Sequence, residues 1–439
     1  MFLNKPEVKI IKEIDTSELW WCSSAVLFSV KNGKNTISEI SGPEDKDYEY
    51  VSQLQLNGKP LVQGKYPECP TCKAMLATGY GIENIESPEL EAARTCMNSE
   101  FVSIMDSAEK IKPLLGLLRD GYYALADTIC FPTDGEGNFF YEVPNELKNF
   151  DAACSGYYCE WDFGLIEHFP FFLYPSQSSS LINNERVNYY SELLRSEKNP
   201  PRALAYHVYG FMNLLLDGHH KACAAASLGE CVRCLTIIPC DGSYFVKDTV
   251  LRGVSFEVCN PQIKTLLFAG LKTDAENDLH YHDIYKGPGK THDVPFRKYS
   301  LTDTKIHYGP DKYPTVRDLA VLMDAGDVIE GLLPDLDPDA ISRLNYEDTD
   351  DADNYLVAIL RFIAFVDKDA AYRLASTIVK NGDGPNRHNR VRAALLYLLQ
   401  FKNDETEQLF ADYYLNHDKN DEHDENLAIA NSYWKDNKN

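Results

Sequence analysis

The stretch LLLDGHHKACAAASLG, residues 214–229, joins an apolar run to a run of small residues through Asp-Gly. The overlapping residues 209–216, YGFMNLLL, have the pattern of a buried strand, and Gly218 allows a sharper turn than a residue with a side chain. The small residues predict a helix that packs closely against a sheet and ends at Gly229. Residues 231–239, CVRCLTIIP, are typical of a strand. The sequence therefore predicts a strand, a glycine turn, a helix and a second strand in succession.

Three basic or titratable side chains, His219, His220 and Lys221, occupy the first turn of this predicted helix. That turn carries unpaired backbone N–H groups and the positive end of the helix dipole, which disfavours cations. A bound phosphate removes the conflict, because its oxygens accept hydrogen bonds from the backbone and from the side chains together. The other interpretation is that both histidines are neutral and pack or cap locally, while Lys221 lies in solvent. The residues alone leave both interpretations open.

Residues 215–237, LLDGHHKACAAASLGECVRCLTI, resemble the second signature box of the ParB/sulfiredoxin fold. Residues 172–194, FLYPSQSSSLINNERVNYYSELL, resemble its first box, in which a strand leads to Pro-x-Gln and a helix follows. The resemblance covers about 80 of the 439 residues. Proteins of this fold include the nucleotide-binding ParB switches, sulfiredoxins and free-serine kinases. The resemblance implies a central α+β domain that binds a nucleotide or another phosphate-bearing molecule.

The resemblance also implies roles for individual residues. Lys221 takes the place of the phosphate-binding arginine, and Gly218 is the turn glycine. His219 stands where sulfiredoxins have their reactive cysteine and where the kinases have a phosphate-contacting histidine, so the kinase pattern fits better. A kinase also needs a carboxylate base from the first box, for which Glu185 and Glu192 are the candidates. The candidate ligand-binding residues are Asp217, Gly218, His219, His220, Lys221 and Gln177, and the candidate catalytic residues are His219, Glu185 and Glu192.

Two classes of function fit these expectations. The first is a nucleotide- or phosphate-binding protein that uses ATP, ADP or CTP with Mg²⁺. If it is an enzyme, it is a phosphotransferase or a nucleotide hydrolase, in which His219 and Lys221 neutralise phosphate charge. The second is a non-enzymatic interaction module, in which the central domain is a degenerate nucleotide-binding core and the C-terminal helices bind a protein partner.

The composition excludes several other classes. The formal net charge is −24 and the pI about 4.8, so non-specific binding to nucleic acid is disfavoured. The first residues, MFLNKPEVKIIKEID, lack the apolar core of a signal peptide, and no apolar run approaches the roughly 18 residues that span a bilayer. We therefore expect a cytoplasmic protein without a membrane partner. In that compartment the twelve cysteines are metal ligands or free thiols rather than disulfides.

One cysteine pair has the spacing of a metal site. Cys69 and Cys72 form a Cys-x-x-Cys within YPECPTCKAMLATGYG, residues 66–81, which is half of a common structural zinc site. Cys154 and Cys159 are the best-placed candidates for the other two ligands. Unliganded thiols and a redox dithiol are the alternatives that the spacing leaves open.

The chain is predicted to be an α+β protein of several domains. Residues 1–160 are a mixed α/β region with a strand at 23–30 and a hairpin at 122–144, and residues 161–314 hold the ParB/sulfiredoxin-like domain and its extension. Residues 315–439 are helical, either as HEAT-like repeats or as a bundle. The acidic stretch 335–353 is predicted to be solvated. Helices are predicted at 89–98, 100–119, 354–366, 369–380, 387–401 and 405–416.

Overall fold

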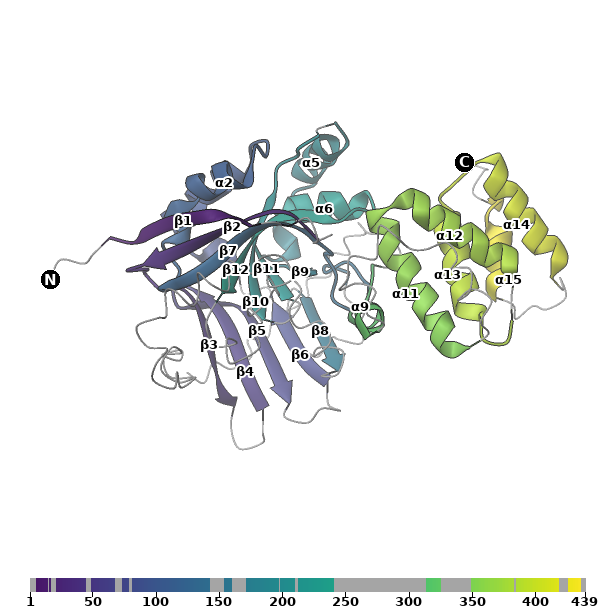
Figure 1. Ribbon diagram of the computed structural model, residues 1–439, viewed down its shortest axis with the longest axis horizontal. Helices are drawn as coiled ribbons and strands as arrows, with labels where there is room; N and C mark the ends of the chain where they lie inside the picture. The colour runs from purple at the N-terminus through teal and green to yellow at the C-terminus, as the bar shows by residue number, and fades with distance from the viewer. Residues whose placement is uncertain are drawn as a thin grey trace. The chain divides into compact units, whose positions relative to one another are not determined.

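The computed structural model divides the chain into two compact units, a first unit of residues 1–316 and a second unit of residues 317–439. The first unit is mixed α/β around a seven-stranded sheet, and the second is helical, which confirms the expected class of each (Figure 1). No helix among the described residues is long and apolar enough to cross a bilayer. The described residues are 5–14, 16, 21–44, 49–67, 73–78, 81–142, 154–159, 171–196, 198–209, 212–240, 313–324, 349–382, 384–417 and 425–435.

The larger sheet of the first unit has the strand order β1-β2-β7-β12-β10-β11-β9. The pairs β10–β12 and β11–β9 are parallel, and the other neighbours are antiparallel. Its central strands are buried almost continuously, as expected of strands covered on both faces. The bounds are β1 Glu7–Ile14, β2 Cys22–Lys31, β7 Gly121–Cys130, β9 Phe172–Tyr174, β10 Ala203–Tyr209, β11 Met212–Asp217 and β12 Val232–Cys240.

This sheet joins strands from both sides of the domain boundary expected at residue 160. Strand β7 pairs with β12 from Val232↔Cys130 to Cys240↔Tyr122. Backbone hydrogen bonds of one sheet therefore join residues before position 160 to residues after it. The hairpin expected at 122–144 is reduced to β7 and an isolated bridge between Thr133 and Phe139. Composition along the chain does not reveal such pairings, because the partner strands lie about 100 residues apart in sequence.

The smaller sheet of the first unit is an antiparallel meander with one late strand. Its order is β3-β4-β5-β6-β8, and every neighbouring pair is antiparallel. Asn57 and Gly58 have positive φ at the β4–β5 turn, a conformation that asparagine tolerates and that glycine adopts readily because it has no Cβ. The bounds are β3 Ile37–Glu44, β4 Glu49–Leu56, β5 Lys59–Pro67, β6 Lys73–Thr78 and β8 Cys154–Cys159.

Serine caps begin two helices of the first unit. Ser87 Oγ accepts a hydrogen bond from Leu90 N at 3.2 Å, and Ser103 Oγ accepts one from Asp106 N at 3.1 Å. The helix expected at 100–119 is two short helices, and the second follows Ile111. The bounds are η1 Ile82–Asn84, α1 Pro88–Met97, α2 Ile104–Lys110, α3 Lys112–Leu115, η3 Ser179–Leu181, α5 Asn184–Ser196 and α6 His219–Ser227.

The second unit contains the four helices expected from periodicity, together with α9 and α15. Helix α15 begins at Glu425, at the end of a second acidic stretch, residues 417–426, whose charge hid a short apolar pattern. Side chains of Thr349, Asp367 and Asn403 cap α11, α12 and α14. The bounds are α9 Val316–Asp324, α11 Asp350–Val366, α12 Lys368–Asn381, α13 His388–Leu398, α14 Asp404–Asn416 and α15 Glu425–Ser432.

The acidic stretch 335–353 is not solvated throughout. Asp353 lies in the first turn of α11 and is only 3% exposed. Its Oδ1 accepts a hydrogen bond from Arg390 N at 2.9 Å and lies 3.4 Å from Arg390 Nε. The expectation of a solvated face was therefore wrong for Asp353, because α11 packs on α13. Residues 335–348 lie outside the described residues.

Candidate functional site

The predicted strand, glycine turn, helix and strand are present as β11, Gly218, α6 and β12. Gly218 has φ 106° and is the N-cap of α6, without a side-chain cap. A Cβ at this position would lie 2.6 Å from Ala203 Cβ, so both the φ value and the space require glycine. The turn therefore brings the first turn of α6 against the beginning of β10.

The two histidines of that turn face the loop that follows β9. His219 Nε2 accepts a hydrogen bond from Ser176 N at 3.0 Å, and His220 Nε2 accepts one from Asn183 N at 3.0 Å. Burial lowers the pKa of His219 to about 3 and that of His220 to about 4, so both rings are neutral near pH 7. Two hydrogen bonds to imidazole nitrogens therefore join the second box, which contains His219 and His220, to the first box, which contains Ser176 and Asn183.

These hydrogen bonds also determine which ring nitrogen carries the proton. A neutral imidazole whose Nε2 accepts a hydrogen bond is protonated on Nδ1. Within the described part of the chain no group accepts a hydrogen bond from Nδ1 of His219 or His220. Side chains in a first turn lean toward the helix N-terminus. The turn therefore offers two neutral side-chain N–H donors in addition to its backbone N–H groups.

Lys221 is neither in solvent nor directed outward. Its Nζ donates to Met97 O at 2.6 Å and to Arg202 O at 2.9 Å, and its side chain is 5% exposed. Burial lowers the pKa of Lys221, and the neighbouring Asp217 carboxylate partly opposes that shift. The ammonium group therefore ties the end of α1 to the beginning of β10.

Asp217 is a carboxylate beside this turn that keeps an unused oxygen. Its Oδ2 lies 3.6 Å from Lys221 Nζ, which is an ion pair but too long for a hydrogen bond. Its Oδ1 lies 3.8 Å from Arg94 Nε. Oδ2 is buried and accepts no hydrogen bond from any described residue. Among the described residues, the ion pair with Lys221 is therefore the interaction given for this oxygen.

Two arginines outside the predicted set add positive charge. Arg94 of α1 lowers the pKa of His219 by its charge, and its Nη1 also pairs with Glu91 at 3.1 Å. Arg186 of α5 is exposed, and its charge lowers the pKa of His220. Sequence reasoning missed both, because their proximity to α6 depends on how α1 and α5 pack. Arg186 lies within the first box, residues 172–194, and this position could have indicated that it lies near the second box.

The predicted carboxylate bases are not brought to this turn. Glu185 and Glu192 are seven residues apart on α5, so they share one stripe, and both are exposed. The buried stripe of α5 contains Val187, Tyr190 and Ser191. Because the two stripes are on opposite sides of the helix, Glu185 and Glu192 point away from the residues that pack inward.

Gln177 lies in the loop between β9 and η3, one residue after Ser176. Its carbonyl oxygen accepts a hydrogen bond from Tyr141 Oη at 2.7 Å. The described contact therefore involves the backbone of Gln177 and leaves its side-chain amide without an assigned role.

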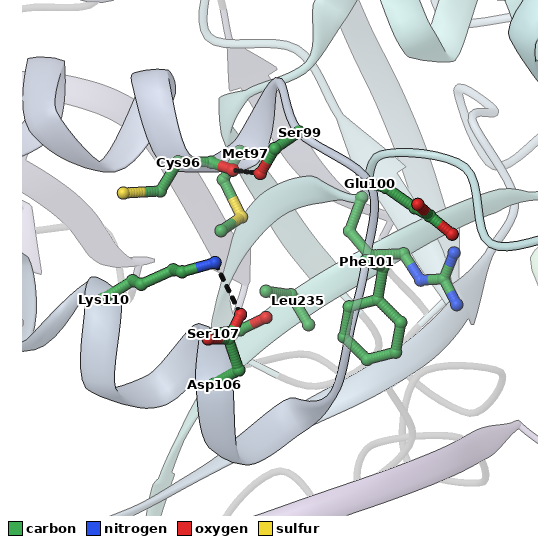
Figure 2. A pocket seen from close by; sticks show the side chains of 10 residues that line it. Cys96, Met97, Ser99, Glu100, Phe101, Asp106, Ser107, Lys110 and Leu235 are labelled. Carbon is green, nitrogen blue, oxygen red and sulfur yellow. Dashed lines mark hydrogen bonds and ion pairs between the residues drawn. The ribbon is translucent and has the colours of Figure 1, made fainter.

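A small pocket lies between α1, α2 and the beginning of β10 (Figure 2). Met97 and Arg202, whose carbonyls accept from Lys221, both line it. The Arg202 guanidinium lies 4.2 Å from the centre of the Phe101 ring and donates to both oxygens of Asp127, at 2.9 and 3.1 Å. The charge of Arg202 is thus already neutralised by Asp127.

The predicted zinc ligands are only partly within the described residues. Cys69 and Cys72 lie outside them, and Cys159 is in register with Lys73, which follows Cys72. Cys154 and Cys159 are the two ends of β8, so their Cα atoms are about 17 Å apart. With Zn–S bonds of about 2.3 Å, one ion cannot bind both. No cluster of three or more potential metal ligands occurs among the residues that the structure describes, and zinc at Cys69 and Cys72 stays a prediction.

Comparison of the chain with models of protein families, with curated proteins and with solved structures found no match. The chemistry of the site therefore has to be argued from the residues around α6.

Proposed function

We propose that the first unit has a ParB/sulfiredoxin-like core that binds a phosphate-bearing ligand at the first turn of α6. The observation that carries this proposal is that Nε2 of His219 and of His220 each accepts a backbone hydrogen bond, next to an uncapped helix N-terminus. This arrangement leaves the proton of each neutral ring on Nδ1. The order β9, loop, α5, β10, β11, Gly218, α6 and β12 supports the core assignment, since it is the order of the two boxes.

In this proposal the phosphate oxygens accept hydrogen bonds from the backbone and from both Nδ1–H groups. Arg186 and Arg94 supply the positive charge. Lys221 has a supporting role, because its hydrogen bonds are already made to Met97 O and Arg202 O. His219 and His220 also hold the loop at residues 176–183 against the turn, so the donors are positioned before the ligand arrives.

If the ligand is a magnesium nucleotide, Asp217 is the described residue that fits the metal. Mg²⁺ prefers carboxylate oxygens, and Oδ2 of Asp217 has no competing hydrogen bond. The ion would supply charge neutralisation to the phosphates. Binding rather than turnover is the proposed activity, because Glu185 and Glu192 lie on the outward stripe of α5.

Calorimetric titration with ATP, ADP and CTP in the presence of Mg²⁺ tests this proposal. We expect saturable binding that weakens at high salt and at least tenfold in Arg186→Ala, since charge-assisted contacts to phosphate are lost. Arg195→Ala is the matched control, because Arg195 is exposed on the same helix about 2.5 turns further on, on the opposite side. Equal weakening by both substitutions contradicts a site at the first turn of α6.

The alternative is a non-enzymatic interaction module with a degenerate core. One observation favours it: His219, His220 and Lys221 all have internal partners, as in a motif kept for structure. The second unit would then supply the protein-binding surface, where Leu396 and Leu415 are exposed. Absence of binding to every nucleotide and to phosphate in the wild-type protein selects this alternative.

A further inference from the structure

The loop that connects β9 to α5 contacts the first turn of α6 through two backbone N–H groups. Ser176 N donates to His219 Nε2, and Asn183 N donates to His220 Nε2, each at 3.0 Å. Ser176 lies near the beginning of the loop and Asn183 at its end. Each imidazole is therefore held by a different end of the same loop.

The first of these donors is itself fixed in place. Ser176 is 0% exposed, and its Oγ donates to Leu215 O of β11. Its carbonyl oxygen accepts a hydrogen bond from Ile82 N of η1 at 3.0 Å. The N–H group that contacts His219 is therefore held by bonds to two other elements.

The second donor belongs to the residue that begins α5. Asn183 Oδ1 accepts hydrogen bonds from Glu185 N at 2.8 Å and from Arg186 N at 3.2 Å, as an N-cap does. Its carbonyl oxygen accepts one from Val187 N at 3.0 Å. Since the N–H of Asn183 donates to His220, one residue positions both the start of α5 and the imidazole ring.

We propose that Asn183 is a positioning residue for ligand binding, because its backbone N–H holds the proton of His220 on Nδ1, from which it is donated to a phosphate oxygen. Ser176 acts in the same way on His219. The hydrogen bond made by one ring nitrogen decides which nitrogen carries the proton, so loss of the loop donor should let the proton of His220 distribute over both nitrogens. This inference rests on the proposed function and names the residues that prepare its donors.

Two substitutions of Asn183 separate its N–H from its side chain. Asn183→Pro removes the N–H and the side-chain cap, whereas Asn183→Ala removes only the cap and is the matched control. Ile182 is already extended, with φ −74° and ψ 128°, as a residue before proline requires. Nitrogen-15 NMR of the labelled histidines in the ligand-free protein shows which ring nitrogen carries the proton.

The expected spectra differ at one ring only. Wild type and Asn183→Ala should carry the proton of His220 on Nδ1, and Asn183→Pro should show a mixture of the two tautomers. His219 is the internal reference, because the N–H of Ser176 remains in all three proteins. The signals of His220 are identified by their loss in His220→Gln.

Calorimetric titration with MgATP then links the tautomer to binding. The affinity of Asn183→Pro should fall in proportion to the fraction of His220 that keeps its proton on Nδ1, so that a fraction of about one half gives about a twofold loss. His220→Gln retains an acceptor for the N–H of Asn183 but has no Nδ1–H. It should therefore show the full loss of one hydrogen bond, about tenfold. Asn183→Ala should bind as wild type does.

The outcomes separate this inference from the proposed function. A wild-type His220 with its proton on Nε2 overturns the inference, as do equal tautomer mixtures in Asn183→Ala and Asn183→Pro. A changed tautomer with unchanged affinity also overturns it and leaves the phosphate site standing on its other donors. If Asn183→Pro does not fold, an unchanged affinity in His220→Gln overturns the inference and a tenfold loss supports it. Absence of MgATP binding by wild-type protein refutes the phosphate site, whatever the tautomers are, and with it the role of Asn183 in binding.

Discussion

Two acid–base pairs of the first unit differ in how many hydrogen bonds join the cation to the carboxylate. Asp127 and Arg202 have side chains 2% and 6% exposed, and they form two hydrogen bonds of 2.9 and 3.1 Å. Asp217 and Lys221 are 3.6 Å apart without a hydrogen bond, and Oδ2 of Asp217 accepts none from the described residues. Both pairs lie near the beginning of β10, since Lys221 donates to the carbonyl oxygen of Arg202.

The two pairs differ in whether the carboxylate has both of its oxygens hydrogen-bonded. We call the Asp127–Arg202 pair closed and the Asp217–Lys221 pair open. A bidentate guanidinium–carboxylate pair satisfies both groups and offers nothing to a ligand. In the second pair the ammonium gives its hydrogen bonds to backbone carbonyls, so the carboxylate keeps an unused oxygen beside the first turn of α6. The first pair therefore satisfies both of its charged groups, whereas the second leaves one buried carboxylate oxygen without a hydrogen bond.

The largest effect is expected from breaking the closed pair. Arg202→Met leaves the Asp127 carboxylate buried without a partner, which should lower the free energy of unfolding by about 3–5 kcal/mol. Urea denaturation followed by circular dichroism measures this change. The double variant Asp127→Leu with Arg202→Met is the control, and it should recover much of the loss, because no isolated charge remains. A loss below about 1 kcal/mol in the single variant contradicts the structural role of this pair.

A smaller loss is expected from the cation of the open pair. Lys221→Met removes two hydrogen bonds and leaves the carbonyls of Met97 and Arg202 without this donor, at a cost of about 2–3 kcal/mol. The same urea experiment checks the value. Lys110→Met is the control, since Lys110 is 43% exposed in a surface pair with Asp106 and should change stability by less than about 0.5 kcal/mol. Equal losses for Lys221 and Lys110 would remove the evidence that Lys221 ties α1 to β10.

Acid should loosen the same turn through its histidines. The native pKa of His219 is about 3, below the unfolded value of 6.5, so the unfolded chain binds more protons between these values. Stability is therefore full above pH 6.5 and falls as the pH decreases, by about 2 kcal/mol between pH 7 and pH 5 for this histidine. His219→Gln, which keeps an acceptor but does not titrate, should flatten the slope of unfolding free energy against pH.

Asp134 acts in the opposite direction in part of this pH range. Burial raises its pKa to about 6, so the native state gains protons there as the pH falls and is stabilised. Since Asp134 is present in both proteins, the difference between wild type and His219→Gln isolates the histidine. Parallel pH profiles for the two proteins would show that His219 does not control the acid response.

The smallest change in stability is expected from the open carboxylate. Asp217→Asn removes two ion pairs longer than 3.5 Å and no hydrogen bond, so unfolding free energy should change by about 1 kcal/mol or less. The Mg²⁺ dependence of nucleotide binding should nevertheless weaken, as measured by titration at several Mg²⁺ concentrations. Asp106→Asn is the control, since this exposed carboxylate pairs only locally with Lys110. An Asp217→Asn protein with unchanged Mg²⁺ dependence would exclude Asp217 as a metal-binding residue.

The sequence by itself determined the elements that depend on local patterns. The strand before Gly218, the small-residue helix α6 and the strand β12 could be predicted, because an apolar run, a glycine turn and the spacing of small residues all lie within about 30 positions. Four helices of the second unit, α11 to α14, followed from their 3.6-residue period for the same reason. The sequence also singled out the first turn of α6, since cations at a helix N-terminus conflict with its dipole.

Only the tertiary structure decided what those residues contact. The partner of His219 lies 43 positions away in the chain and the partner of Lys221 at Met97 lies 124 away, so no local pattern could name them. The pairing of β7 with β12 also depends on packing between distant segments. The same holds for the exposure of Glu185 and Glu192. The sequence shows which side chains need a partner, whereas the folded chain determines which group is close enough to be that partner, because hydrogen bonds and burial act over a few ångströms in space and not along the chain.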